Sequence, residues 1–178
     1  METMDSGVQP KLIRDLQVRA DYGQIYIYSA ASFDDDPQVS LDALEDARGS
    51  RRFVGTAGAG GFIDLLTPGQ WNWKTPVRIE VFPAEPKGDT DEWEHEVDVD
   101  LDVPDGRLWF EPAGGSGNAV ETKVPAGEYR VRVSGRGFAA LGRAGAEGSD
   151  SYRLRLWART TDAPAALRKF WSGWENYR

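Results

Sequence analysis

The chain of 178 residues contains no cysteine and a single histidine, His95. The absence of cysteine excludes disulfides, thiolate metal sites and a cysteine nucleophile. One imidazole supplies little for a zinc site or a serine triad, and the nucleophile motif G-x-S-x-G is missing. The sequence therefore predicts a protein that is not an enzyme and has no catalytic residue, no metal site and no cofactor. A lone histidine beside apolar residues is expected to be structural.

The chain also lacks a long apolar run. No stretch of 18 apolar residues is present, and the N-terminal sequence METMDSGVQPKLIRD has no hydrophobic signal-peptide region. These absences predict a soluble cytoplasmic protein of bacterial type. Residues 1–11 are expected to form a disordered tail, and residues 12–178 a single domain that is long enough to bury a core.

Residues 93–102, WEHEVDVDLD, alternate strictly in character. The odd positions hold apolar residues and His95. Every even position holds an acid, and these five carboxylates are called the acidic row: Glu94, Glu96, Asp98, Asp100 and Asp102. Successive side chains of a strand point to opposite faces, so this segment predicts a strand with one mostly apolar and one acidic face. Like charges this close repel, so the row needs cations, a bound ion or a partner.

The negative charge of the protein is concentrated around that row. The whole chain has a net charge of −8, whereas residues 85–105 contain ten acids and one base. The rest of the chain carries about as many bases as acids. A localised acidic surface disfavours direct binding of nucleic acid and favours a basic protein partner.

Short strands separated by turns dominate the pattern. Strands are expected at residues 24–29, 62–66, 77–82, 93–102, 107–111, 120–124, 128–134 and 151–158, with a flexible glycine-rich connection at 55–61. Ser40 is a candidate N-cap for one short helix that ends at Arg48. Apolar residues at mixed spacings of three and four make the tail from Pro164 to Arg178 compatible with a helix. The sequence predicts a mainly β protein, an antiparallel β-sandwich of seven or eight strands with one short helix and a helical C-terminal tail.

Arginines alternate on two later strands and could neutralise the acidic row. Arg130 and Arg132 share one face of EYRVRVS, and Arg153 and Arg155 share one face of SYRLRLWA. Pairing would give a solvated ladder of cross-strand ion pairs, each contributing about 0.2–1 kcal/mol. Four arginines can neutralise at most four of the ten acids, so an excess of negative charge is expected to remain.

Other uses of the acids stay open. The loop acids at residues 34–36 and 89–92 could bind Ca²⁺, although neither matches an EF-hand, and a Ca²⁺- or carbohydrate-binding β-sandwich module is the alternative function. Two carboxylates about 5–9.5 Å apart in a cleft would suit glycoside hydrolysis. Trp71 and Trp73, on the same side of an extended segment, could anchor a partner or plug one end of the sandwich.

The order of elements resembles the competence protein J family, small acidic bacterial proteins associated with inhibition of a DNA-entry nuclease. The resemblance rests on QIYIYS, LDALEDAR, GGFIDLL, VRIEVF, EHEVDVDLDV, VPAGEYRVRV and DSYRLRLW, in this order over roughly residues 16–160. It is a match of pattern and assigns no site residue.

That resemblance implies an inhibitor or immunity-type protein that binds a basic partner such as a nuclease or toxin. An acidic ridge on a rigid strand can compete with nucleic acid for a positively charged site. The candidate interface is the acidic row with Trp71 and Trp73. Neither a nucleic-acid nor a membrane partner is expected.

Overall fold

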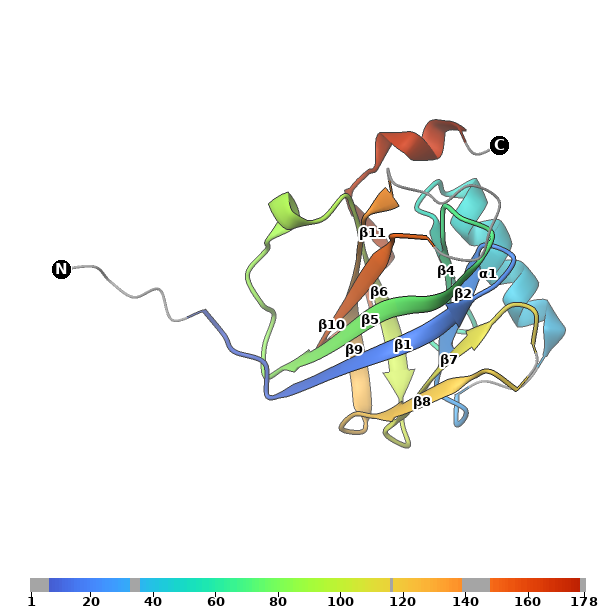
Figure 1. Ribbon diagram of the computed structural model, residues 1–178. Helices are drawn as coiled ribbons and strands as arrows, with labels where there is room; N and C mark the ends of the chain where they lie inside the picture. The colour runs from blue at the N-terminus through green and yellow to red at the C-terminus, as the bar shows by residue number, and fades with distance from the viewer. Residues whose placement is uncertain (1–6, 33–35, 116, 139–147, 177–178) are drawn as a thin grey trace.

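Two β-sheets and one α-helix make up the computed structural model, which describes residues 7–32, 36–115, 117–138 and 148–176 (Figure 1). The larger sheet has six strands in the order β1 (Leu12–Ala20), β5 (Asn72–Phe82), β10 (Ser151–Ala158), β9 (Gly127–Arg136), β6 (His95–Val103) and β11 (Ala166–Lys169). The smaller sheet has five, in the order β3 (Val54–Ala57), β4 (Phe62–Leu66), β2 (Gln24–Tyr28), β7 (Arg107–Pro112) and β8 (Val120–Lys123). The architecture is sandwich-like and mainly β.

The core lies between the two sheets and follows the two-residue period of the strands. On β6 the odd residues Val97, Val99 and Leu101 are fully buried, as the alternation predicts. They face Ile27 of β2 and Ile63 of β4 within one apolar cluster. Burying this apolar surface provides the main favourable contribution to folding.

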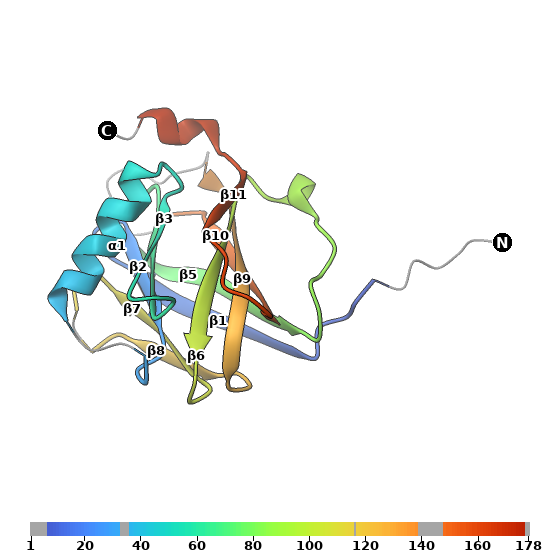
Figure 2. The ribbon, with the colours of Figure 1, turned by 180° about the vertical axis from the view of Figure 1, so that it is seen from behind.

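Helix α1 (Pro37–Gly49) covers the outer side of the smaller sheet (Figure 2). The Asp36 side chain caps the helix by accepting a hydrogen bond from the Gln38 amide. Ala43 and Ala47 form its buried face. A Cβ placed on Gly55 of β3 would lie 1.8 Å from the Ala43 carbonyl oxygen, so this glycine permits the close approach of helix and strand.

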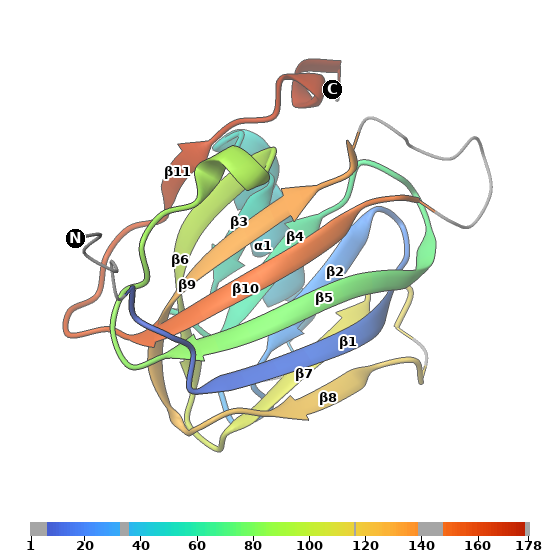
Figure 3. The same ribbon diagram turned by 60° about the vertical axis from the view of Figure 1, so that its left-hand side comes forward.

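A crossover, residues 83–94, joins β5 to β6. These two strands are separated in the sheet by β10 and β9, so the crossover must pass over the sheet rather than turn directly (Figure 3). It contains one 3₁₀ turn, η1 (Thr90–Glu92). The outer face of the six-stranded sheet, which carries the acidic row, therefore has the crossover lying along it.

The structure corrects the predicted fold in several details. All eight predicted strands are present, but β1, β3 and β11 bring the number to eleven in the described residues, and β3 occupies part of the glycine-rich segment expected to be flexible. β5 and β10 pair in parallel, so the sandwich is not purely antiparallel. The helix begins at Pro37, earlier than Ser40.

The C-terminal segment is not a continuous helix. It forms β11 and then a 3₁₀ turn, η3 (Ser172–Asn176), because residues 166–169 add a strand to the edge of β6. Tyr177 and Arg178 lie outside the described residues, as do residues 1–6 of the predicted N-terminal tail.

Candidate functional site

The acidic row faces arginines on the neighbouring strand. Asp98 is the register partner of Arg132, and Asp100 that of Arg130, across the antiparallel pair β6–β9. Arg132 donates to Asp98 through two nitrogens, at 2.8 and 3.0 Å. Despite its burial, the pKa of Arg132 is raised, chiefly by this hydrogen bond. The two charges are held as a paired, buried unit.

Asp100 and Asp102, at the C-terminal end of the acidic row, form ion pairs that include an arginine outside β9. Arg130 donates to Asp100 at 2.9 Å, and Arg159, just after β10, lies 3.6 Å from Asp100 and 2.6 Å from Asp102. Asp100 also accepts a hydrogen bond from the Ala163 amide. Asp100 and Asp102 are therefore half-buried, and the charges of Arg130 and Arg159 neutralise them.

Glu94 and Glu96, in the upper part of the row, accept hydrogen bonds from donors other than arginine, although one oxygen of Glu96 has no hydrogen-bond partner among the described residues. Glu94 accepts hydrogen bonds from the amides of Gly137 and Phe138. Glu96 is fully buried and accepts one from the Ser134 hydroxyl. With Asp98 only 4% exposed, two of the five predicted interface carboxylates have almost no surface.

The crossover brings further acids to the remaining arginines. Asp89 binds Arg153 at 2.6 and 2.7 Å and lies 3.2 Å from Arg155. Burial alone would raise the pKa of Asp89, but the hydrogen bonds and charges of these two arginines lower it. The arginine rows therefore neutralise the acidic segment from two directions. Glu85 of the crossover contacts Arg132, and the segment between β10 and β11 contacts Arg130 and Asp100, so the ladder is largely covered rather than solvated.

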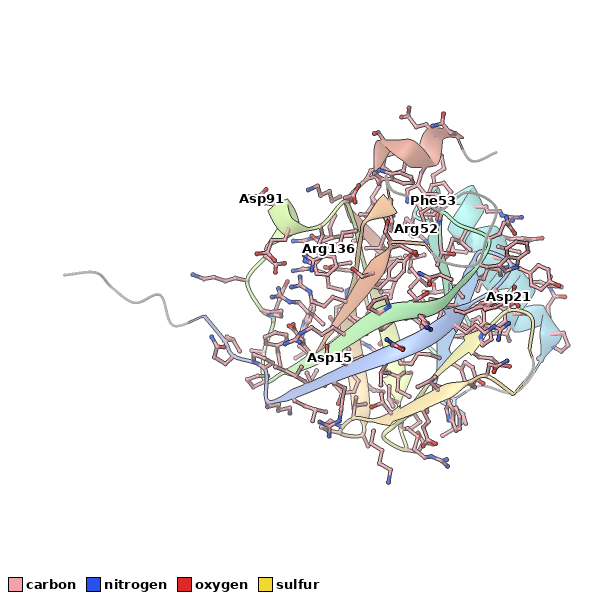
Figure 4. All side chains as sticks on the ribbon, viewed as in Figure 1. Asp15, Asp21, Arg52, Phe53, Asp91 and Arg136 are labelled. Atoms are coloured by element: carbon pink, nitrogen blue, oxygen red, sulfur yellow. The ribbon has the colours of Figure 1, made fainter. Side chains whose placement is uncertain are left out.

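Three acids of the crossover keep much of their surface. Asp91 and Glu92 are exposed, and Glu85 keeps 59% of its side-chain surface although it lies 3.4 Å from Arg132. Figure 4 shows Asp91 on the outer side of the crossover. The solvent-exposed carboxylates on this face therefore lie mainly on the crossover and not on the acidic row.

Trp71 and Trp73 lie exposed at the start of β5. Their side chains are 43% and 50% exposed, and the Arg19 guanidinium lies 4.4 Å from the centre of the Trp73 ring. Tyr22, in the turn between β1 and β2, is 65% exposed and lies at the same end, because the Gly23 amide donates to the carbonyl oxygen of Gln70. Tyr22, Trp71 and Trp73 are called the aromatic patch. Sequence reasoning missed Tyr22, since no local pattern ties that turn to residue 70.

His95 is buried and linked to two other segments. Its Nε2–H donates to the Arg52 carbonyl oxygen, and its Nδ1 accepts from the Trp171 amide at 3.1 Å. Burial lowers the pKa of His95, and the hydrogen bond to Arg52 offsets part of that effect. The neutral imidazole thus joins β6 to the segment before β3 and to the C-terminal segment.

Asp64 on β4 is a buried carboxyl with no hydrogen-bond partner among the described residues. It pairs in register with Tyr26 on one side and with Gly55, under α1, on the other. Burial raises its pKa to about 8, opposed only by the charge of Arg48. Asp64 is therefore mainly protonated at neutral pH.

The described residues contain no group of three or more histidine or acidic side chains placed to hold a metal ion. In the first candidate Ca²⁺ loop, Asp34 and Asp35 lie outside the described residues. In the second, Asp89 is bound to arginines. No helix in the described part of the chain is long and apolar enough to span a membrane.

Comparison with known proteins finds likeness in structure but not in sequence. No protein-family model matches the chain, and no curated protein is similar to it in sequence. ComJ from Bacillus subtilis, described as the inhibitor of the DNA-degrading activity of NucA, superposes with a TM-score of 0.52 at 16% identity, over 85% of this chain and 98% of ComJ. A protein described as crocagin biosynthetic gene J superposes with a TM-score of 0.54 at 14% identity, over 83% and 97%. The resemblance to the competence protein J family is confirmed for the fold.

Proposed function

We propose that this protein is a non-catalytic, inhibitor-type module that binds another protein through its aromatic patch. The observation that carries the proposal is the exposure of Trp71 and Trp73 at the start of β5, an interior strand of the larger sheet. Tryptophan and tyrosine are enriched among residues that dominate binding energy at protein interfaces, because they bury a large area and lose little conformational entropy. Exposed single apolar residues are ordinary, but three large exposed aromatics at one end of the sandwich are not.

The acids are assigned a supporting role. Glu96 and Asp98 are buried against Ser134 and Arg132, so their contribution is to hold β6 on β9. The exposed crossover acids Asp91 and Glu92 add negative charge to this side of the molecule. Such charge raises the association rate with a basic partner, such as a nuclease or toxin.

The fold of ComJ supports an inhibitor-type function, since similar two-sheet frameworks serve an inhibitor of a DNA-degrading activity in that protein. Fold alone does not carry function to this chain, and the proposal therefore rests on the patch.

Affinity capture from the native host tests the proposal. Wild-type protein, a Trp71→Ser/Trp73→Ser double variant and a Leu41→Ser control would serve as baits; Leu41 is 52% exposed on α1, at a separate surface. A partner retained by wild type and control, but lost by the double variant, is then purified for titration. We expect at least a hundredfold weaker binding by the double variant, since hot-spot residues contribute about 2 kcal/mol or more each.

Charge reversal of Asp91 and Glu92 to lysine separates the role of the acids. The association rate should fall several-fold and lose its salt dependence, while the dissociation rate stays nearly constant. Equal capture by wild type and the tryptophan double variant would exclude the patch as the binding surface. The partner's own activity, assayed with and without this protein, decides whether binding inhibits it.

A further inference from the structure

A pocket of about 470 Å³ opens at the end of the sandwich next to the aromatic patch. It is called the end pocket and is enclosed by four segments: the β1–β2 turn, the end of β4 with the loop after it, the end of α1 with the loop after it, and η3. Figure 4 shows Phe53, one of its lining residues, below the C-terminal turn. Small-molecule sites typically have volumes of about 300–1,000 Å³, so the pocket has the size of such a site.

One wall of the end pocket is aromatic and apolar. The rings of Phe53 and Trp174 stack with centroids 4.2 Å apart and planes 6° from parallel, and Leu66 extends the apolar surface. Phe53 and Trp174 are buried, so packing fixes their positions. The small part of the two rings that reaches the pocket is therefore held in place before any ligand binds, which lowers the cost of ordering on binding.

The rim carries two arginines with no carboxylate partner. Arg48 and Arg51 are both exposed, and neither lies within 4.0 Å of an acidic oxygen of the described residues. The adjacent Arg52, by contrast, binds Asp46 at 2.8 Å. Buried Asp64 lies near enough for the charge of Arg48 to affect it, but its pKa of about 8 leaves it mainly uncharged at neutral pH. The Arg51 guanidinium lies over the Phe170 ring, 5.9 Å from its centre. Guanidinium groups without a carboxylate partner are suited to carboxylates and phosphates.

The remaining polar lining is mostly neutral. Gln24, Thr67 and Gln70 add hydrogen-bonding groups, and Glu175 is the one acid that lines the pocket. The lining therefore carries a net positive charge, in a protein whose overall charge is −8. The pocket therefore favours the binding of anions, although the protein as a whole is negatively charged.

Unusual backbone geometry gathers at the same place. Tyr22, Arg51 and Phe53 have φ of 53°, 58° and 57°, a left-handed conformation that bulky residues rarely adopt. Across the described residues only Ala59, outside the pocket, is a fourth non-glycine residue in this region. Such conformations concentrate at binding sites, where the surrounding structure holds them in place.

We propose that the end pocket binds a small organic anion, with its carboxylate or phosphate held by Arg48 and Arg51 and its planar apolar body against Phe53 and Trp174. The aromatic wall favours a ligand with an apolar body, and the two guanidinium groups favour one with a negative charge. The end pocket shares Tyr22 with the aromatic patch but is not lined by Trp71 or Trp73. Loss of anion binding can therefore be measured apart from loss of the protein contact of the two tryptophans.

Calorimetric titration of the full chain with matched probes tests this site. Indole-3-acetate and phenyl phosphate supply the two kinds of anion on an aromatic body, and indole-3-acetamide is the uncharged analogue. At least one anion should bind at millimolar concentration or below, and the amide should bind at least tenfold more weakly than the acetate if the carboxylate is preferred. Failure of both anions to bind, or equal binding of indole-3-acetate and its amide without binding of phenyl phosphate, would overturn the proposal.

Single substitutions locate the binding. Arg48→Gln and Arg51→Gln should each weaken the bound anion at least tenfold, whereas Arg14→Gln, at an exposed arginine of β1 outside the pocket, should not. Glu175→Gln should tighten binding because it removes the single acid of the lining. Arg51→Lys keeps the charge but loses the two-pronged geometry, and should fall between wild type and Arg51→Gln. An anion that binds the Arg48→Gln/Arg51→Gln double variant as tightly as wild type would assign the binding to another place and refute the site.

Discussion

Arg132 and Asp98 face each other across β9 and β6 and are joined by two hydrogen bonds, at 2.8 and 3.0 Å, with both side chains almost completely buried. Arg132 also lies over the Trp157 ring, at 5.4 Å from its centre. A buried pair of this kind is expensive to break, because the charge left behind in a poorly hydrated place keeps only a longer ion pair: Arg132 with Glu85 at 3.4 Å, or Asp98 with Arg168 at 3.7 Å.

Asp98→Ala is therefore expected to lower the free energy of unfolding by about 3–5 kcal/mol, measured by urea denaturation. The double variant Asp98→Leu/Arg132→Met should recover most of that loss, since replacing both charges with apolar groups is often neutral. Arg107→Ala, which breaks an exposed pair with Glu121, is the control and should have no measurable effect. An Asp98→Ala protein as stable as the control would mean that the pair is hydrated in solution.

The burial of His95 should make the folded protein less stable in mild acid. Burial lowers its pKa in the folded protein below the ordinary value of 6.5, so the unfolded chain takes up a proton first as the pH falls. The contribution of His95 is thus complete above pH 6.5 and declines below it, until the lowered folded pKa is reached. His95→Gln cannot titrate, so its free energy of unfolding, relative to wild type, should rise as the pH falls below 6.5. A constant difference between the two proteins would contradict the assignment.

Chelators and Ca²⁺ should leave the melting temperature unchanged. Asp89, Asp98 and Asp100, which a bound cation would need, already accept from arginines. Differential scanning calorimetry with EDTA and with millimolar CaCl₂ checks this expectation. A Ca²⁺-dependent rise in melting temperature would favour the Ca²⁺-binding module over the inhibitor-type protein.

Local alternation predicted the strands but not their neighbours. The parity of residues 93–102 was enough to place β6 and its buried face, because period two has one structural meaning. The pairing of Asp98 with Arg132 depends on β9 lying beside β6, which follows from long-range strand order and not from either segment alone. Two buried carboxylates of the acidic row could not be distinguished in sequence from exposed ones for the same reason.

The missed strands share weak local signals. In β1, Arg14 interrupts the apolar residues at even positions. In β3, a glycine indicates a loop in sequence, whereas in the structure Gly55 lets α1 pack closely against the strand. The spacing of Leu167, Phe170 and Trp174 suits a helix, yet the edge of β6 offers unpaired backbone groups and β11 takes them. The end pocket brings together four segments far apart in the chain, so no sequence motif could indicate it.

Asp64 gives a stability effect of opposite sign to that of His95. Its pKa is about 8 in the folded protein and about 3.8 in the unfolded chain, so between these values the folded state holds a proton that the unfolded state has lost. The contribution of Asp64 to stability should therefore fall as the pH rises from 4 to 8, by at most roughly 1.4 kcal/mol per pH unit. Asp64→Asn removes this titration, and its stability relative to wild type should climb across that range and level off above pH 8. Urea denaturation of both proteins at pH 5, 7 and 9 measures the difference, and a difference that does not change with pH would show that Asp64 is ionised and solvated in the folded protein.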